Sequence, residues 1–447
     1  MQQMILPWLS VVLLLVYAVV IVARFRRKRA KNTASRRPPK KGNQQQAKDG
    51  KIAERFVSQH CEATFLRLWG IANPIGKDQR KELCDYLVVC DPDIIIISAK
   101  DIALPDNANS IERERWRRKA IKKSVESIYG AERILRTLDE IRTPSGRALK
   151  LPTVADRQFH RICIAFGSRR EIPISAGNFG KGFVHVLEEV TVPILLRELD
   201  TISDFTSYLT AKEKLIERGC AVVGSGEEGL LALYLHNGRS FPARYDRIVV
   251  DETLWDDLSK DPTYLAGREA NKNSYAWDNV IEYVTKGLIA GDLLFSDPAG
   301  DEEKVLRTMA REPRFYRRYL GESLTEVLMS EKIRARIIQS QSSVVYVIAA
   351  FSRAEDRLSR KAELTARCYV ARSRFKDEAC KVVGIASERA SDGKPGLSFD
   401  LMMIDVPVWT AELHAQAEKA KNELGFFKDP EQSTRHHEEY PATKSTP

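Results

Sequence analysis

Two short apolar stretches end in residues that could together hydrolyse a phosphodiester bond. Asp85 precedes the apolar run Tyr86–Cys90, and Lys100 lies just after a second run, Ile94–Ile97. A carboxylate in such a place can hold a divalent metal ion that activates water, and a lysine can orient that water or stabilise developing negative charge. The sequence therefore contains a candidate hydrolytic pair.

The two residues meet only if the runs form a hairpin in one particular register. The loop between them has a proline between two aspartates, which indicates a turn. A four-residue loop would pair Val89 with Ile94. Asp85 would then face Ser98, with Lys100 diagonal to Asp85 on the same face, whereas an odd loop length would move Asp85 to the other face. The alternative without chemistry is a cross-strand ion pair, worth under about 1 kcal/mol where exposed.

A basic surface is predicted on the next helix, which the pattern places over residues 111–142. Residues 113–123 contain seven basic side chains and one acid. Four of the basic residues share one helix face, which would suit contact with a DNA backbone. These four are Arg115, Arg118, Lys119 and Lys122. The alternatives are an ordinary solvated face or contact with a nearby membrane.

Together these features resemble the PD-(D/E)xK nuclease superfamily, in particular the bacterial nuclease-related domain type, over about residues 51–142. In that family a helix bearing a glutamate precedes an acidic residue that opens an apolar strand, and (D/E)-x-Lys closes the next strand. Glu54 matches the helix glutamate, Asp85 the metal-binding aspartate and Lys100 the catalytic lysine. The resemblance implies a restriction-endonuclease-like fold, magnesium as cofactor and DNA as substrate.

One position departs from the family pattern. Ser98 stands where the second metal-binding acid is expected, and a hydroxyl is a poor ligand for a hard cation beside carboxylates. Nearby acids could supply the missing ligand: Glu82, Asp93, Asp101 or a helix carboxylate. For an active enzyme we expect Asp85 and Glu82 as metal ligands, with Glu54, Ser98 and Lys100 in the same site. The alternative is a catalytically inactive interaction or sensor module built on the nuclease-like fold.

The N-terminus predicts a membrane anchor. Residues 5–23 carry no charge and would span about 28 Å as a helix, close to the hydrocarbon thickness of a bilayer. The basic cluster at residues 24–29 predicts a cytoplasmic C-terminal side and attracts anionic lipid headgroups. We therefore expect a single-pass protein of the inner (plasma) membrane, with residues 1–4 outside the cytoplasm and the bulk of the chain inside it.

The same N-terminal segment explains the net charge of +10. Residues 1–50 hold 11 Lys or Arg and one acid, while the rest of the 447-residue chain holds 60 of each sign. The neutral body therefore gives no general signal for a polyanionic partner. Seven scattered cysteines without a C-x-x-C pair indicate neither a zinc cluster nor a disulfide framework.

The body is expected to be α/β, with a nuclease-like mixed sheet, flanking helices and a further α+β C-terminal region. The expected units are a basic flexible linker at 24–50, the nuclease-like domain at 51–145, a middle α+β region at 146–340, a C-terminal α/β unit at 341–425 and a disordered tail at 426–447. The pattern of the C-terminal unit predicts the order strand, helix, strand, strand, helix.

A glycine-rich motif lies in the middle region. Gly224–Gly229 spells G-x-G-x-x-G, the pattern of a dinucleotide-binding turn. Glu227 and Glu228 would repel a pyrophosphate at the start of the following helix, and no clear strand–turn–helix unit is predicted around the motif. We therefore expect an ordinary turn.

Overall fold

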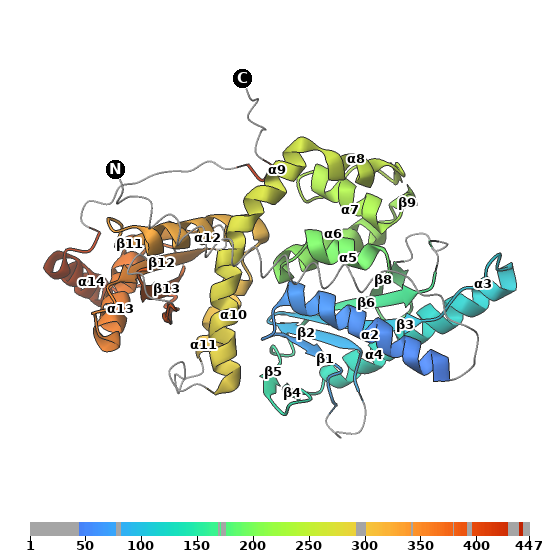
Figure 1. Cartoon of the computed structure of the whole chain (residues 1–447), viewed down its shortest axis with the longest axis horizontal. Helices are drawn as coiled ribbons and strands as arrows, with labels where there is room; N and C mark the ends of the chain where they lie inside the picture. The colour runs from blue at the N-terminus through green and yellow to red at the C-terminus, as the bar shows by residue number, and fades with distance from the viewer. Residues whose placement is uncertain are drawn as a thin grey trace, which may run out of the picture. The chain divides into compact units, whose positions relative to one another are not determined.

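The computed structural model describes most of the chain after residue 43. The described residues are 44–76, 82–168, 170, 176–291, 301–340, 343–378, 380–390, 396–427 and 438–440. The chain divides into two compact units, Met1–Lys48 and Asp49–Pro447. Every described strand belongs to the second unit, which is an α/β structure with two larger mixed sheets and two small two-stranded ones (Figure 1).

The first larger sheet has six strands in the order β1-β2-β3-β6-β8-β7. Its strands are β1 (Gly70–Ala72), β2 (Tyr86–Cys90), β3 (Asp93–Asp101), β6 (Gln158–Phe166), β7 (Gly177–Asn178) and β8 (Phe183–Glu188). The predicted hairpin is confirmed, because β2 and β3 are antiparallel and Val89 pairs with Ile94. β3, β6 and β8 run parallel. Half of the strands therefore come from residues beyond the predicted nuclease-like segment 51–145.

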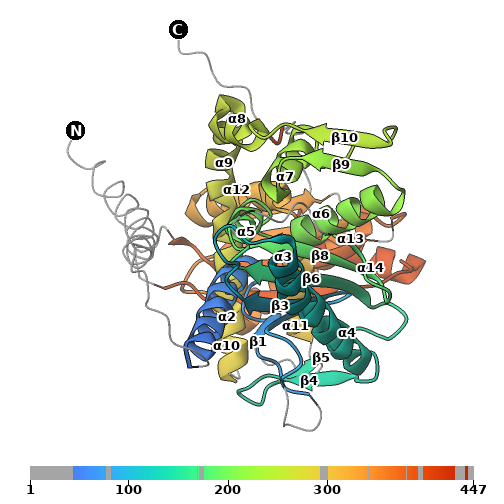
Figure 2. The same ribbon diagram turned by 90° about the vertical axis from the view of Figure 1, so that its right-hand side faces the viewer.

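Helices cover both faces of this sheet, as the continuous apolar runs of β2 and β3 require. One face packs against α2 (Gln44–Phe65), α5 (Thr191–Glu198) and α6 (Ile202–Glu217). The other face packs against α3 (Ser110–Arg117), the π-helical turn η1 (Arg118–Lys122) and α4 (Lys123–Leu135). Figure 2 shows α2 and α4 on either side of the strands. The buried apolar side chains of this sheet therefore belong to two separate cores.

The second larger sheet has the order β11-β12-β13-β14 and confirms the predicted order of elements in the C-terminal unit. Its strands are β11 (Ala335–Gln339), β12 (Val344–Phe351), β13 (Lys381–Glu388) and β14 (Phe399–Ile404), and its helices are α13 (Arg357–Arg374) and α14 (Ala411–Leu424). β12 and β13 are parallel and α13 connects them. This connection is the usual way to join neighbouring parallel strands.

The segments between the two sheets are mostly helical. They comprise β4 (Glu140–Arg142), β5 (Ala148–Lys150), β9 (Ala221–Gly224), α7 (Glu227–His236), β10 (Arg247–Val250), α8 (Leu254–Lys260), α9 (Pro262–Ala270), the 3₁₀ turn η2 (Asn271–Ser274), α10 (Tyr275–Ala290), α11 (Asp301–Ala310) and α12 (Arg314–Met329). One apolar core runs from the first sheet through these helices to the second sheet. Within it, the ring of Trp277 on α10 lies 5.0 Å from that of Tyr346 on β12.

The fold class predicted from the sequence needs one correction. The prediction included an N-terminal transmembrane helix over residues 5–23, but no helix in the described part of the chain is long and apolar enough to cross a membrane. The first described helix, α2, has 22 residues and is charged along its length. It packs against the sheet through Ala53, Val57 and Cys61. The structure supports an α/β class with mixed sheets, and the predicted anchor and its basic cluster lie outside the described residues.

Two predicted boundaries also differ from the structure. Residues 44–50, assigned to the flexible linker, form the first turns of α2. Residues 438–440, assigned to the disordered tail, lie against the body: Arg318 Nη2 donates to the carbonyl of Glu439 at 3.1 Å. The ring of Tyr440 lies 5.9 Å from that of Tyr264 on α9. A short C-terminal segment is therefore part of the folded structure.

Candidate functional site

The hairpin brings Asp85 and Lys100 to neighbouring places at one end of β2 and β3. Both charges act on the buried thiol of Cys163 on β6, which pairs with Ser98 of β3. Burial raises the pKa of Cys163 to about 12; Lys100 lowers it and Asp85 raises it. The predicted register of the hairpin is therefore confirmed, and it puts Asp85 and Lys100 at the same end of the two strands.

The carboxylate of Asp85 nevertheless has a structural role. Its Oδ2 accepts a hydrogen bond from the backbone N–H of Ala99 at 2.6 Å. β2 begins at Tyr86, which pairs with Ile97, so no residue of β2 lies opposite Ala99. The Asp85 side chain accepts the hydrogen bond that a strand carbonyl would otherwise accept. A buried or half-buried backbone donor needs such a partner. This hydrogen bond is sufficient to explain an acid at position 85 without a bound metal ion.

Glu54 is separated from the other residues of the predicted metal site. Glu54 lies on α2, which packs on the sheet face opposite α3 and α4. Ser98 is buried in β3, while Glu82 is exposed and forms an isolated backbone bridge with Ile75. The described residues contain no group of three or more His, Cys, Asp or Glu side chains arranged to hold a metal ion. They therefore do not fit the magnesium site that the sequence predicts.

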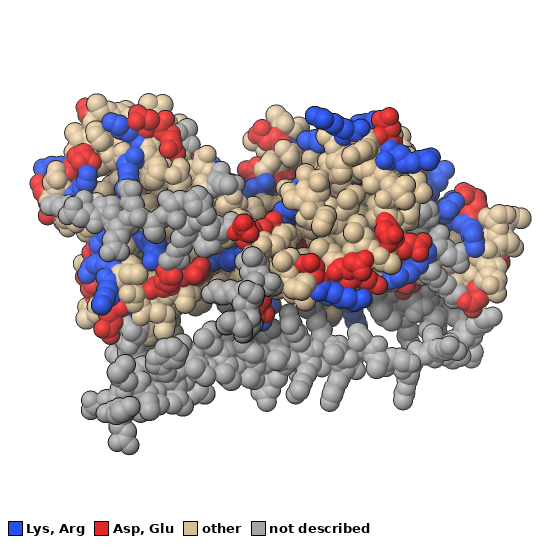
Figure 3. All heavy atoms as spheres, turned by 90° about the horizontal axis from the view of Figure 1, so that it is seen from above, with Lys and Arg blue, Asp and Glu red and all other residues tan. Residues whose placement is uncertain are grey.

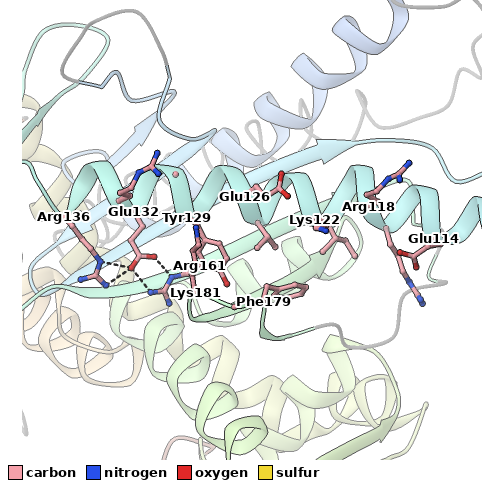
Figure 4. Close-up of a pocket in the computed structure, with 16 residues that line it drawn as sticks. Glu114, Arg118, Lys122, Glu126, Tyr129, Glu132, Arg136, Arg161, Phe179 and Lys181 are labelled. Carbon is pink, nitrogen blue, oxygen red and sulfur yellow. Dashed lines mark hydrogen bonds and ion pairs between the residues drawn. The ribbon is translucent and has the colours of Figure 1, made fainter.

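A basic groove lies on the α3–α4 side of the same sheet. It has a volume of about 1180 Å³ and is formed by α3, η1 and α4 on one side and the β7–β8 hairpin on the other (Figure 4). Its charged lining consists of Arg117, Arg118, Lys122, Arg133, Arg136, Arg161, Lys181, Glu114, Glu126 and Glu132. Seven cations against three acids make the groove strongly positive. We refer to it below as the basic groove.

This concentration of cations is local. Basic and acidic side chains are interspersed over the face shown in Figure 3, as a body with equal numbers of both predicts. Within the described residues, no carboxylate lies within ion-pair distance of five groove cations. These are Arg117, Arg118, Lys122, Arg133 and Lys181. The basic groove is therefore a surface whose cations are available to an anionic ligand.

The predicted basic helix face is only partly correct. Arg118 and Lys122 line the basic groove, whereas Arg115 and Lys119 are exposed elsewhere on the same helix. Groove residues recur at ordinary helical spacing, for example at positions 114, 118, 121, 125, 129, 132 and 136. Arg115 and Lys119 lie beside this stripe, so the predicted face is displaced from the one that meets the β7–β8 loop.

An ion-pair cluster fixes the floor of the basic groove. Glu132 on α4 accepts hydrogen bonds from Arg136 on its own helix and from Arg161 on β6 (Figure 4). Burial would raise the pKa of Glu132, but the two guanidinium groups outweigh that effect and lower its pKa. The carboxylate is therefore charged at neutral pH and ties the helix to the sheet.

The opposite wall is a tight hairpin loop. Asn178 Oδ1 accepts hydrogen bonds from the backbone N–H groups of Gly180 and Gly182, at 2.8 and 3.2 Å. The hydroxyl of Tyr129 on α4 donates to the carbonyl of Gly182 at 2.6 Å. Gly182 has φ +118°, and a Cβ there would come within 3.0 Å of the Arg161 guanidinium, so a glycine is required. The loop is fixed to both α4 and β6.

The loop presents Phe179 and Lys181 to the basic groove, and neither residue is predicted as a site residue from the sequence. Phe179 is 43% exposed, unusually for a phenylalanine. The loop sequence, Asn-Phe-Gly-Lys-Gly, does carry a turn signal that could have identified the loop. Nothing in this local sequence indicates that the loop lies beside a helix about 50 residues earlier in the chain. Arg161 was not predicted either, since it lies within a strand whose following residues are all apolar.

The glycine-rich motif lies in a strand–turn–helix unit, although the sequence pattern does not predict one there. β9, α7 and β10 form a strand–helix–strand unit with parallel strands, and Gly224 at φ +113° makes the turn. Both acids occupy the start of α7. Glu227 is buried and accepts hydrogen bonds from Tyr208 and Lys212, and Glu228 lies against Gly226. The place where a pyrophosphate would bind thus already holds carboxylates.

Comparison with known proteins does not identify the chain. No family model, curated protein or solved structure matches it. The resemblance to the PD-(D/E)xK superfamily therefore stays a prediction. The functional assignment depends on the residues of the basic groove and on the geometry around Asp85.

Proposed function

We propose that this protein binds nucleic acid through its phosphate backbone in the basic groove, and that its nuclease-like sheet acts as a scaffold. The observation that carries the proposal is the row of cations along α3, η1 and α4 that have no ion-pair partner among the described residues, faced by Lys181. Phosphate contacts by Lys and Arg supply most of the non-specific affinity of proteins for nucleic acids. They position the polyanion without reading its sequence.

The form of the basic groove also suits a polymer. Its lining follows one helix from Glu114 to Arg136, about six turns, so the cations are spaced along a line. Arg117, Lys122 and Arg133 mark successive places on that line. A single small anion would need convergent donors, whereas a chain of phosphates can meet cations placed in sequence.

A hydrolytic role has less support. Asp85 is engaged by the Ala99 N–H, and Glu54 belongs to the helix on the opposite face of the sheet. Lys100 matches the catalytic lysine of the resemblance by its place in the sequence, but an amine alone does not activate water for phosphodiester hydrolysis. We therefore favour the binding module over the nuclease.

The chain offers a matched pair of variants for the test. Lys122→Ala removes a cation that lines the basic groove, and Lys119→Ala removes one that is exposed on the same helical turn outside it. The affinity of the full chain for fluorescein-labelled DNA should be measured by anisotropy over a series of salt concentrations. Every variant keeps the basic residues 1–50, so only the difference between the two variants reports on the basic groove.

We expect Lys122→Ala to weaken binding and to reduce the slope of log affinity against log salt by about 1. Lys119→Ala should leave both quantities close to those of the unmodified chain. A second pair, Arg118→Gln and Arg115→Gln, should behave in the same way. Equal effects within each pair, or no effect of either variant, would refute the proposal.

A further inference from the structure

The basic groove contains an aromatic side chain that phosphate binding does not use. Phe179 is the only phenylalanine among the described residues whose exposed fraction exceeds a third. No aromatic ring or guanidinium in the described part of the chain stacks on it. An exposed ring is costly in water unless a ligand covers it. Phe179 therefore has a free face within a positively charged groove.

The ring is held in place by its loop. Asn178 closes the loop through the amides of Gly180 and Gly182, and Tyr129 fastens the loop to α4. Phe179 thus stands on a short segment in which Asn178, Gly180 and Gly182 are held by these hydrogen bonds. A ligand that stacks on the ring loses little entropy in ordering the protein, since the loop is already arranged.

The ring and the cations lie on opposite walls of the same groove. Figure 4 shows Phe179 below the helix that carries Arg118 and Lys122, with Lys181 on the same loop as the ring. A strand whose phosphates follow the helix would turn its bases toward the loop. A positive groove combined with an aromatic platform is the arrangement by which proteins hold single-stranded nucleic acid.

We infer that the basic groove binds single-stranded nucleic acid, with an unpaired base stacked on Phe179. This inference rests on the proposed function and adds the class of ligand to it. In a duplex both faces of each base are covered by its neighbours, so Phe179 gains nothing from an intact double helix. A single strand exposes base faces and can place one on the ring.

The test replaces the ring without changing the charge. Phe179→Ala removes the platform, Phe179→Leu keeps an apolar side chain without a π-face, and Phe179→Trp supplies a larger platform. The full chain and each variant should be titrated by anisotropy against labelled thymidine and uridine homopolymers of equal length and against a DNA duplex of that length. Phe179 is on an exposed loop, and thermal unfolding should verify that every variant folds.

We expect Phe179→Ala to weaken binding of the single strands by about 5- to 150-fold, the range of one base–aromatic stack. Phe179→Leu should also weaken it, and Phe179→Trp should retain it. Duplex binding and the salt dependence should be unchanged in all three variants, because no phosphate contact is lost. The two homopolymers report whether the ligand is DNA or RNA.

The outcomes separate this inference from the proposed function. If Phe179→Ala leaves single-strand binding unchanged while Lys122→Ala weakens it, the stacking inference is wrong and phosphate binding stands. Equal losses for single strands and duplex on Phe179→Ala would also overturn the stacking inference. If neither Phe179→Ala nor Lys122→Ala weakens binding, both proposals are wrong.

Discussion

The carboxylate of Glu132 on α4 and the guanidinium of Arg161 on β6 form a two-point ion pair at the floor of the basic groove, with Arg161 Nη2 2.8 Å from Glu132 Oε1. A third group, the Arg136 guanidinium, donates to the same carboxylate. Glu132 is therefore a junction between the helix that carries the cations and the sheet that supports it.

Glu132→Gln should destabilise the protein. The substitution leaves the half-buried Arg161 guanidinium without its counter-charge, and breaking a buried pair from one side costs about 3–5 kcal/mol. Urea unfolding followed by circular dichroism measures the free energy of unfolding. Glu126→Gln is the control, since Glu126 is exposed on the same helix and should change stability by about 0.5 kcal/mol at most. A similar small loss for Glu132→Gln would mean that the pair does not fasten α4.

The stability of the protein should fall in acid partly through this residue. The pKa of Glu132 is lowered in the folded protein from its ordinary value of 4.5. The stabilisation is therefore fully present above pH 4.5 and is lost as the pH falls through the lowered pKa, because the unfolded chain binds the proton first. The free energy of unfolding should decrease less between neutral and acid pH in Glu132→Gln than in the unmodified chain. Parallel pH profiles would contradict the assigned shift.

Gly130 offers a way to fill the basic groove without disturbing the fold. It lies inside α4 and lines the groove, and a Cβ there would meet no atom within 4 Å. Gly130→Ala should therefore raise the free energy of unfolding by about 1 kcal/mol, the helix-propensity difference. Gly130→Glu should place an anion in the groove and weaken nucleic-acid binding more than the uncharged Gly130→Gln. Equal binding by these two variants would indicate that the ligand avoids this part of the groove.

Magnesium should not stabilise the protein. A metal ion that binds only the folded state raises the melting temperature, but the described residues around Asp85 form no metal-binding group. We expect the same melting temperature with magnesium and with a chelator. Asp85→Ala should lower it in both conditions, since the Ala99 N–H loses its acceptor, at a cost of about 1–3 kcal/mol. A rise with magnesium that Asp85→Ala abolishes would restore the hydrolytic interpretation.

The sequence predicts best what depends on neighbouring residues. The register of the β2–β3 hairpin follows from a four-residue loop between two apolar runs, and Val89 does pair with Ile94. Asp85 and Lys100 consequently lie near one another. The C-terminal unit is also predicted correctly in its order of elements, because its strands and helices have distinct apolar periods.

The basic groove is harder to predict from the sequence. Helical periodicity groups Arg115 and Lys119 with the groove cations, but it does not show which edge of that face meets the β7–β8 loop. Phe179 reaches the groove only through the tertiary position of its hairpin. Glu54 matched a motif by its place in the sequence, but its helix packs on the other face of the sheet. Each of these positions depends on how the helices and the loop pack in the tertiary structure.

The docking of the C-terminal segment can be tested at a second helical glycine. Gly267 on α9 faces this segment, and a Cβ there would lie 2.8 Å from the carbonyl oxygen of Glu439 and 2.9 Å from the Tyr440 ring. Gly267→Ala should therefore displace residues 438–440, and hydrogen exchange of their amides should become faster. Helix propensity favours alanine by about 1 kcal/mol, so the sign of the stability change depends on whether the segment is docked.

Truncation supplies the control for this prediction. In a chain that ends before Glu438, nothing opposes the new methyl group, and Gly267→Ala should stabilise the protein as Gly130→Ala does. In the full chain the same substitution should stabilise less or destabilise, because it also disturbs the bonds from Arg318 and Arg239 to Glu439. Identical effects of Gly267→Ala in the two chains would show that the segment is not docked against α9 in solution.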